Sequence, residues 1–497
     1  MTTTAAETAE PRTSGVPAFA VLPVLVVAGL AGVLLLVTSG RYAHGFDELY
    51  FVMAGRDHLN WGYFDQPPLI PLLAGGMDRL FPGSLVALRL PMTLAAAGGV
   101  VVTAVTAREL GGGRGAQVMA AGAYATSGVM TLSHWMGTYV LDPFWWTLLF
   151  WLVVRWVRLH RDGVRDDRPL LWAGLVTALS LETKFLVPAF WALMALSAAV
   201  LGPRELLRRP KLWIGAAIAV AATVPTLVWQ AANGWPYARM SEVVSAEFPG
   251  TWSFLEGAVL SAGTGVGCLA LLYGVWRLLR SPELRAFRFL GVAVVALVVT
   301  FLLAHGRSYY ALSVYSLPFA AAAVELRRRN LVPWWKAVVW PAFVVSALIT
   351  AVALPIYPAS VVDKVPTRWG VITSGAAFAQ GELPAQEMGT VAGSAYAALS
   401  PEEKAHTAVF SDIYPFAAAA EFYGRADGID RVYSGHRGYW YFGPPPESAD
   451  SVLFVGVDPA VLKPYFATMT PVMEGLVWRY DGRNQPWAAC CPALKSQ

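Results

Sequence analysis

The sequence predicts an α-helical polytopic membrane protein with about 11 crossings, followed by a smaller C-terminal α/β module outside the membrane. Two observations support this fold class. The chain has 497 residues and is 56% hydrophobic but only 14% charged, whereas soluble proteins carry about 25% charged residues. Apolar runs long enough to cross a membrane also recur as far as residue 355, and only strand-length apolar runs follow.

The membrane part is expected at residues 17–355. Residues 1–16 are rich in Thr, Ala, Glu and Pro, which is typical of a disordered tail. Phe19–Gly40 supplies about 20 apolar residues without a following A-x-A cleavage site, so it predicts an uncleaved first crossing. Ten further crossings are expected at Leu85–Ala107, Gly115–Leu132, Pro143–Leu159, Leu170–Ser180, Phe185–Leu201, Leu212–Gln230, Phe254–Trp276, Phe287–Ala304, Tyr309–Val324 and Ala337–Leu354.

The basic residues indicate the orientation of the chain. One set of alternate loops and span ends holds 19 Lys and Arg residues, and the other set holds 7. Because basic loops remain in the cytoplasm, this bias predicts that the N-terminus, with the tail at 1–16, is cytoplasmic. The expected location of the protein is the plasma membrane. The outer face is then expected to carry the loops 41–84, 133–142, 231–253 and 305–308 and the C-terminal module at 356–497.

Several classes of protein and site are disfavoured. The basic residues do not alternate with aromatic residues as in a nucleic-acid groove, so no nucleic-acid partner is expected. The three cysteines, Cys268, Cys490 and Cys491, do not form a disulfide framework. Gly263, Gly265 and Gly267 lie inside an apolar run with no strand before them, which favours close helix packing over a dinucleotide-binding loop.

The first outer loop concentrates acidic residues. Asp47 and Glu48 are adjacent where the first apolar run has ended, and Asp65 precedes Gln66 and two prolines. An acidic pair at the mouth of a membrane domain suits a catalytic base, an ion site or a substrate clamp. The alternative is that Asp47 caps a helix running through Leu59, because Asp is a preferred N-cap residue.

The other outer loops carry polar residues toward the same face. Ionisable groups at membrane depth are costly and indicate a functional site with a partner. We therefore expect acids and bases from separate loops to meet there. The alternative for each loop is interfacial anchoring, with Asp142-Pro143 starting a helix and Arg307 joining an aromatic belt. The residues concerned are Asp47, Glu48, Asp142, Lys184, His305 and Arg307.

The C-terminal segment reads as a small α/β module. Ala408–Phe410 and Ser451–Val457 have strand length and composition, and Pro415–Tyr423 is helical in pattern. The aromatic segment Tyr433–Pro446 could line a sugar or lipid site, or could pack the module onto the membrane domain. Packing is the favoured interpretation.

Several motifs are spread over nearly the whole chain. They are DELYFVMAGRDHLNWGYFDQPPL, LDPF, the Lys184 loop, WQAANGWP, HGRSYY, EFYGR and SGHRGYW. Together they resemble a known family, the polytopic glycosyltransferases of the protein O-mannosyltransferase and lipid A aminoarabinose-transferase type. The resemblance implies a C-type glycosyltransferase fold. It also implies transfer of a sugar from a polyprenyl-phosphate carrier to a protein, lipid or glycan acceptor at the outer face, among membrane lipids.

The resemblance also implies roles for individual residues. Asp47 would be the catalytic base, with Glu48 as its neighbour and Asp142 as a second acidic position. Many relatives have a basic residue where this chain has Gln66, so the phosphate ligands differ in part. The donor-phosphate residues would be Arg307, Lys184, His305, Tyr309 and Tyr310, and the substrate-lining residues Tyr63, Asp65, Gln66, His134 and Trp235.

This chemistry suits the residue types. A carboxylate can remove the proton of an attacking acceptor hydroxyl, and Arg or Lys can stabilise a lipid-phosphate leaving group. A single base predicts inversion at the sugar carbon, unlike the two-step route of retaining hydrolases. No cofactor or zinc cluster is expected, although Asp47, Glu48 and Asp142 could share a divalent cation. The main alternative function is a transporter or lipid flippase that uses the same charges.

Overall fold

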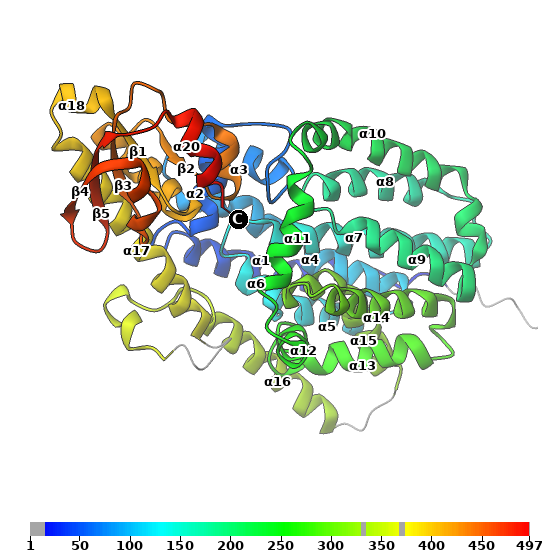
Figure 1. Cartoon of the computed structure of the whole chain (residues 1–497). Coiled ribbons are helices and arrows are strands. Elements are labelled where there is room, and N and C mark those ends of the chain that lie inside the picture. Colours follow the sequence, from blue (N-terminus) through cyan, green and yellow to red (C-terminus); the bar gives the residue numbers. More distant parts are fainter. Residues whose placement is uncertain (1–14, 330–333, 367–372, 497) are drawn as a thin grey trace, which may run out of the picture.

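The computed structural model describes residues 15–329, 334–366 and 373–496. Of the tail expected at 1–16, residues 1–14 lie outside the described residues. The chain forms a helical bundle with a smaller sheet-containing module at one end (Figure 1). The short helix α11 runs across the direction of the long bundle helices near that end.

The bundle is built from helices of very different lengths. Among the described residues, five helices, namely α1, α4, α7, α10 and α14 with the turn before it, are long and apolar enough to cross a membrane by length and composition. The helices are α1 (Val21–Ser39), α2 (Phe46–Asp57), α3 (Leu69–Leu80), α4 (Leu85–Glu109), α5 (Arg114–Ala125), α6 (Gly128–Leu132), α7 (Thr138–Arg161), α8 (Arg168–Leu181), α9 (Val187–Leu201), α10 (Pro210–Ala232), α11 (Pro236–Ala246), α12 (Thr251–Leu260), α13 (Val266–Arg280), α14 (Arg288–Leu303), α15 (Ser316–Arg328) and α16 (Trp334–Val352).

The lipid-facing surface is visible in the exposed side chains. Leu22 and Leu30 of α1 are 74% and 67% exposed, and Trp213 and Val228 of α10 are each 61% exposed. Apolar side chains arranged along such long helices need a hydrocarbon environment. Together with the apolar helices, they make the chain a multi-pass membrane protein.

Three of the expected crossings are interrupted. Gly115–Leu132 is divided between α5 and α6, and Phe254–Trp276 between α12 and α13. Tyr309–Val324 begins as a 3₁₀ helix, Ser308–Val314, before α15. The other expected crossings each coincide with a single helix, within a few residues at either end.

The first two interruptions lie against each other. The backbone N–H of Gly128 donates to the carbonyl of Ser261 at 2.8 Å. Gly263 has φ 109°, and a Cβ on it would lie 2.2 Å from the carbonyl oxygen of Thr126. Irregular backbone at membrane depth persists only where protein groups surround it, as they do here. Gly263 and Gly265 lie in the break between α12 and α13, both with positive φ, so the expectation that they pack helix against helix is wrong for these two residues; Gly263 instead packs against the backbone of the other break.

Two buried glutamates form salt bridges with arginines at the ends of several helices. Glu109, at the end of α4, accepts from Arg155 of α7 at 2.8 Å and also pairs with Arg158. Glu325 of α15 accepts from Arg277 of α13, with Nε 2.8 Å from Oε2. The basic residues of separate loops thus meet at one side of the membrane domain, as the alternation of basic loops predicts.

The module contains a five-stranded mixed sheet with the order β2-β1-β3-β5-β4. β1 runs parallel to β2 and β3, whereas β5 runs antiparallel to β3 and β4. The expected strands are confirmed as β1 and β3, and the expected helix as α19. The elements are α17 (Ser374–Ala397), α18 (Pro401–His406), β1 (Thr407–Ser411), α19 (Tyr414–Tyr423), β2 (Val432–Ser434), β3 (Ser451–Val455), β4 (Phe466–Met473), β5 (Val477–Arg483) and α20 (Trp487–Leu494).

The module is fixed to the membrane domain through α2. Apolar residues of α2, α19, β1 and β3 form one buried cluster. From the aromatic segment, Phe442 stacks on His58 with ring centroids 4.1 Å apart, and Tyr439 lies 6.1 Å from Tyr50. A Cβ on Gly438 would lie 1.9 Å from the Tyr50 hydroxyl, so this approach requires glycine. These contacts bring the start of α2 against the module.

Candidate active site

A cavity of about 130 Å³ lies where α2, the ends of the membrane helices and the module meet. Ligand pockets commonly enclose about 300–1,000 Å³, so only the reacting part of a large substrate fits this space as it stands. Its lining is mostly polar, with charged groups of both signs. The lining residues are Asp47, Phe51, Asp65, Gln66, Thr138, Tyr139, Lys184, Tyr237, Met240, Val244, Arg307, Tyr309, Tyr310, Tyr414 and Arg437.

Asp47 is the second residue of α2. The alternative interpretation, in which Asp47 is the N-cap of this helix, is therefore wrong. Gly45 occupies the N-cap position, and its backbone N–H donates a hydrogen bond to Glu48 Oε2 at 2.8 Å. The helix also ends at Asp57 and not at Leu59. The carboxylate of Asp47 is therefore not used for capping and lines the cavity.

Tyr414 orients the Asp47 carboxylate. The Tyr414 hydroxyl, from the first turn of α19, donates to Asp47 Oδ1 at 2.7 Å. Burial and the nearby Asp47 charge raise the pKa of Tyr414 well above its usual value, so its hydroxyl remains a donor. The module thus supplies one hydrogen bond to the acidic group of the membrane domain.

Asp65 is a second acid in the cavity, with a different environment. It accepts from the Tyr50 hydroxyl at 3.1 Å. Burial, aided by the charge of Asp47, raises the pKa of Asp65 to about 6. The neighbouring Gln66 is only 3% exposed, and its Nε2 has no hydrogen-bond partner among the described residues.

Cationic groups line the same cavity. Lys184, in the turn between α8 and α9, has its Nζ 4.0 Å from the ring centroid of Tyr310 and 4.9 Å from that of Tyr309. Arg307 Nη1 donates to the Tyr309 hydroxyl at 3.2 Å and also pairs with Glu247. The ring faces of Tyr309 and Tyr310 hold the Lys184 cation without neutralising it, so its positive charge remains available for an anion, whereas Arg307 is already paired with a carboxylate.

Glu48 lies outside the cavity, in a buried charge cluster. Arg89 of α4 donates to it twice, with Nε 2.9 Å from Oε1 and Nη2 2.7 Å from Oε2. The backbone N–H of Met136 adds a third bond at 2.8 Å. Burial alone would raise the pKa of Glu48, but the charge and hydrogen bonds of Arg89 hold it below its usual value. Glu48 therefore anchors the start of α2 and does not line the cavity.

His134 belongs to the same buried cluster. Its Nε2 lies 3.2 Å from Oε1 of Glu382, a residue of α17, and 3.0 Å from Arg89 Nη1. Burial lowers the pKa of His134 well below its usual value, which keeps the ring neutral. Burial also raises the pKa of Glu382 to about 8. The cluster joins the membrane domain to the module without lining the cavity.

Four further predicted residues lie away from the cavity. Asp142 is inside α7, because this helix begins at Thr138, and accepts from Ser313, Trp146 and Ser180. His305 and Trp235 are exposed, and the His305 ring stacks on Phe248. Tyr63 is buried and donates to backbone carbonyls of the first outer loop.

The structure also brings in residues that the sequence did not single out. Tyr414 and Arg437 come from the module, more than 360 residues from Asp47 along the chain. Arg437 lies within the SGHRGYW motif, one of the motifs that resemble the family. That motif was the only feature of the sequence that could have pointed to Arg437. Tyr139 and Tyr237 line the cavity from α7 and α11, with no distinguishing pattern around them.

The three carboxylates considered as a shared cation site lie in separate environments. Asp47 faces the cavity, Glu48 pairs with Arg89, and Asp142 is held by α7, α8 and the 3₁₀ helix before α15. Among the described residues, no three His, Cys, Asp or Glu side chains are grouped as metal ligands.

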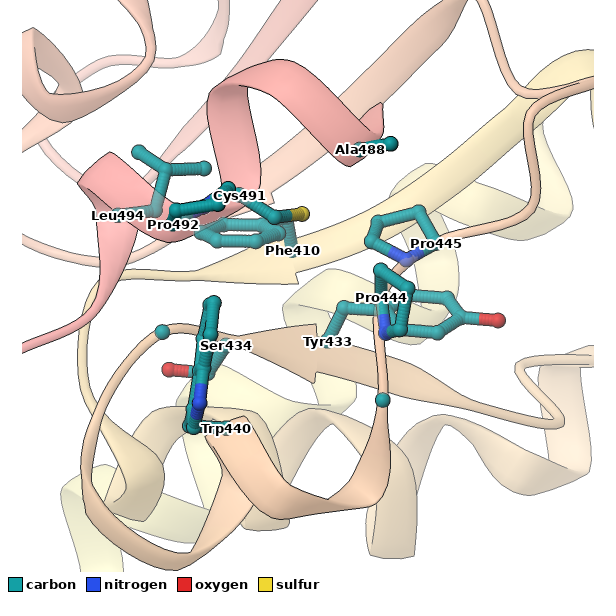
Figure 2. Close-up of a pocket in the computed structure, with 12 residues that line it drawn as sticks. Phe410, Tyr433, Ser434, Trp440, Pro444, Pro445, Ala488, Cys491, Pro492 and Leu494 are labelled. Atoms are coloured by element: carbon teal, nitrogen blue, oxygen red, sulfur yellow. The ribbon is translucent and has the colours of Figure 1, made fainter. Parts of the chain in front are cut away.

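A second pocket, of about 230 Å³, lies inside the module (Figure 2). Trp440 and Tyr433 of the aromatic segment face it across from Phe410 and Pro492. Its lining holds no carboxylate and no cationic side chain, so it lacks the groups that a transfer reaction needs. The aromatic segment thus both contacts α2 and lines this apolar pocket.

Comparisons with known proteins bear on the fold of the chain. Residues 65–229 match the model of the dolichyl-phosphate-mannose-protein mannosyltransferase family, which is about a third of the chain. No curated protein sequence matches the chain significantly.

Solved structures match much more of the chain. ArnT from Cupriavidus metallidurans, bound to undecaprenyl phosphate, matches with a TM-score of 0.61 and 16% identity, over 92% of this chain and 97% of ArnT. The apo state of ArnT matches over the same shares with a TM-score of 0.62. The chain has the C-type glycosyltransferase fold. The resemblance expected from the sequence motifs is thereby confirmed.

A more distant match shares the C-type glycosyltransferase fold. It is AglB, an oligosaccharyltransferase from Archaeoglobus fulgidus, solved in complex with an inhibitory peptide and a dolichol-phosphate. The match covers 93% of this chain and 74% of AglB, with a TM-score of 0.53 and 13% identity. At such identities the likeness defines the fold, and the chemistry has to be argued from the cavity itself.

Proposed function

We propose that the protein is a membrane glycosyltransferase that moves a sugar from a polyprenyl-phosphate carrier to an acceptor on the outer face of the membrane. The observation that carries this proposal is the cavity in which Asp47 lies with Lys184 and Arg307 at the end of the membrane helices. The structures of ArnT with undecaprenyl phosphate and of AglB with a dolichol-phosphate support a lipid phosphate as the donor's carrier.

Asp47 is the proposed general base. A hydroxyl of the acceptor attacks the anomeric carbon, and Asp47 takes the hydroxyl proton as the new carbon–oxygen bond forms. The Tyr414 hydrogen bond to Oδ1 fixes the carboxylate. Glu48, bound to Arg89, holds the first turn of α2 in place and is a positioning residue.

Lys184 and Arg307 are the proposed partners of the leaving group. As the bond between the sugar and the phosphate breaks, the phosphate oxygen gains negative charge, which nearby cations stabilise. Tyr309 and Tyr310 contact these cations and complete the wall. Asp142 is not assigned a contact with the substrate, because Ser313 and Trp146 hold its carboxylate among the helices and it does not line the cavity.

Asp65 and Gln66 are proposed to contact the sugar or acceptor. Because the pKa of Asp65 is about 6, this group is mostly ionised at neutral pH and accepts hydrogen bonds from hydroxyl groups. We assign Asp47 as the only base and Asp65 to binding hydroxyl groups, which corresponds to a single displacement with inversion. Both hexose and pentose donors, and protein, lipid or glycan acceptors, are compatible with this chemistry.

The proposed orientation puts the cavity and the module outside the cytoplasm and the N-terminus inside. The 19 basic residues in one set of loops support it, as do the arginines paired with Glu109 and Glu325 at the corresponding helix ends. The donor would then reach the cavity from the outer leaflet, through the lipid around the bundle.

The test is transfer from a panel of radiolabelled polyprenyl-phosphate sugars by the purified full chain in vesicles, with acceptors from a native membrane extract. Asp47→Asn is compared with Asp430→Asn, the same change at an exposed residue of the module. Transfer that Asp47→Asn abolishes and Asp430→Asn preserves supports the proposal. Transfer that both variants preserve, or none from any donor, overturns it and favours the transporter alternative.

A further inference from the structure

Two side chains of the cavity hold buried nitrogen atoms without partners. These are Nε2 of Gln66 and Nε of Arg437, neither of which has a hydrogen bond to a described residue. Nearly all buried donors in native proteins are satisfied, so each exception calls for an explanation. Both residues line the cavity that contains Asp47. Their positions indicate that an acceptor-rich group of a ligand completes these bonds.

Arg437 is held in place by its backbone and by an aromatic ring. It has φ 47°, a conformation that residues other than glycine rarely adopt, and its N–H donates to the carbonyl of Ser496 at 3.1 Å. Its guanidinium lies 5.5 Å from the ring centroid of Tyr414, the residue that orients Asp47. Strained backbone of this kind concentrates at functional sites.

Glu247 connects Arg437 to Arg307. Its Oε1 lies 3.3 Å from Arg437 Nη2, and its Oε2 lies 3.2 Å from Arg307 Nε and also contacts Nη2. Arg307 thus presents two donors to this carboxylate, whereas Arg437 presents one and keeps Nε unused. Glu247 is also the most exposed member of the group, with 43% of its side chain accessible against 16% for Arg437.

We propose that Arg437 binds the phosphate of the lipid donor together with Arg307, and that Glu247 is an internal counter-ion that this phosphate displaces. The inference rests on the proposed function and adds to it a phosphate-binding residue from the module. This role explains why the Glu247 carboxylate pairs with both Arg307 and Arg437 beside the cavity. The carboxylate reduces the net charge of the two arginines until the phosphate of the donor binds.

The geometry of phosphate suits this exchange. A guanidinium presents parallel N–H groups that match two oxygens of a phosphate, so both Nε and Nη2 of Arg437 can then be satisfied. A carboxylate beside the phosphate would repel it, so Glu247 has to move away. Glu247 follows the last residue of α11, and Gly250 has φ 96°, so the segment that carries the side chain ends in a flexible residue.

The experiment measures the dissociation constant of undecaprenyl phosphate for the purified full chain in lipid nanodiscs. The variants are Glu247→Gln, Arg437→Gln and Arg437→Lys, with Glu242→Gln as a control that removes the same charge from an exposed position on α11. Losing one competing charge next to an anion site should tighten binding by about tenfold, and losing one arginine should weaken it by about tenfold. Arg437→Lys, which keeps the charge but not the paired donors, should recover part of the loss.

Each outcome bears on the inference. Tighter binding by Glu247→Gln, weaker binding by Arg437→Gln and no change in Glu242→Gln support it. If Glu247→Gln weakens binding as Arg437→Gln does, Glu247 only positions the arginines and the counter-ion role is wrong. If all variants bind like the unmodified chain, the inference fails while the proposed function stands. If the unmodified chain itself does not bind undecaprenyl phosphate, both fail. Should Arg437→Gln not fold, the Glu247→Gln and Glu242→Gln pair decides the question.

Discussion

The ion pair between Glu48 and Arg89 should contribute strongly to stability, because it positions the helix that carries Asp47. Both side chains are fully buried, and Arg89 makes two hydrogen bonds to Glu48. Arg89 Nη1 also donates to the carbonyl of Ser39 and Nη2 to that of Ala43, both at 2.8 Å. The substitution Arg89→Met removes all of these donors and leaves the Glu48 carboxylate buried.

The expected cost follows from two independent estimates. Removing one partner of a buried ion pair commonly costs about 3–5 kcal/mol. Two charge-assisted hydrogen bonds at about 1.5–3 kcal/mol each give about 3–6 kcal/mol. For a chain of 497 residues, an unfolding entropy of about 2.1 cal/mol/K per residue amounts to roughly 1 kcal/mol/K. The loss should therefore lower the thermal midpoint by about 3–6 °C.

The assay is thermal unfolding of the purified protein in one detergent, followed by intrinsic fluorescence. Arg161→Met serves as the control, because Arg161 forms an exposed pair with Asp162 and should change the midpoint by less than about 1 °C. Glu48→Met combined with Arg89→Met should cost clearly less than the sum of the two single changes, since the Glu48 carboxylate is then no longer buried without its counter-ion.

Two results would refute this reasoning. One is a midpoint for Arg89→Met that matches the Arg161→Met control, since a buried carboxylate would then have lost its counter-ion without consequence. The other is strict additivity of the Glu48→Met and Arg89→Met costs, which would mean that the two side chains do not depend on each other.

Further predictions concern the surroundings of the cavity. Because burial raises the pKa of Glu382 from 4.5 to about 8, its contribution to stability is complete below about pH 4.5 and is lost as the pH rises through about 8. Glu382→Gln should therefore flatten the fall of the thermal midpoint between pH 6 and 9, and an unchanged slope would contradict the assignment. On α3, Gly75→Ala should destabilise the protein, because the new Cβ would meet the Gly55 backbone at 2.3 Å. Gly76→Ala meets nothing within 4 Å and should stabilise it by about 0.5–1 kcal/mol, so equal effects on the midpoint would refute the close contact.

The membrane domain was largely predictable because its signal is local. An apolar run of about 20 residues has to become a helix in lipid, whatever surrounds it. The interruptions within the expected crossings were not predictable, because a glycine such as Gly263 is equally compatible with a tightly packed helix and with a break between two helices. Only the partner segment at Thr126 and Gly128 decides between them, and it lies more than 100 residues away.

The candidate site was predictable in part. Charges from several loops do meet at one face, and Asp47, Lys184 and Arg307 share a cavity. Glu48 was predicted to belong to the site with Asp47 because the two are adjacent in the sequence. Consecutive helix residues point in different directions, however, and Glu48 is buried in a salt bridge with Arg89.

The residues from the module were the hardest to find. The hydrogen bond from Tyr414 and the place of Arg437 depend on how the module docks against α2, and no periodicity in the sequence encodes that docking. Asp142 was placed in a loop because Pro143 suggested a helix start, whereas α7 begins one turn earlier at Thr138.

The central claim is that Asp47 is the base of a single-displacement sugar transfer. It is tested most directly by single-turnover transfer with the donor that the radiolabelled panel identifies, combined with the anomeric configuration of the product. The account predicts an inverted product and a rate for Asp47→Asn lower by about 10²–10⁴-fold, with donor binding retained. A retained configuration, or an Asp47→Asn rate within about twofold of the unmodified chain, would contradict it.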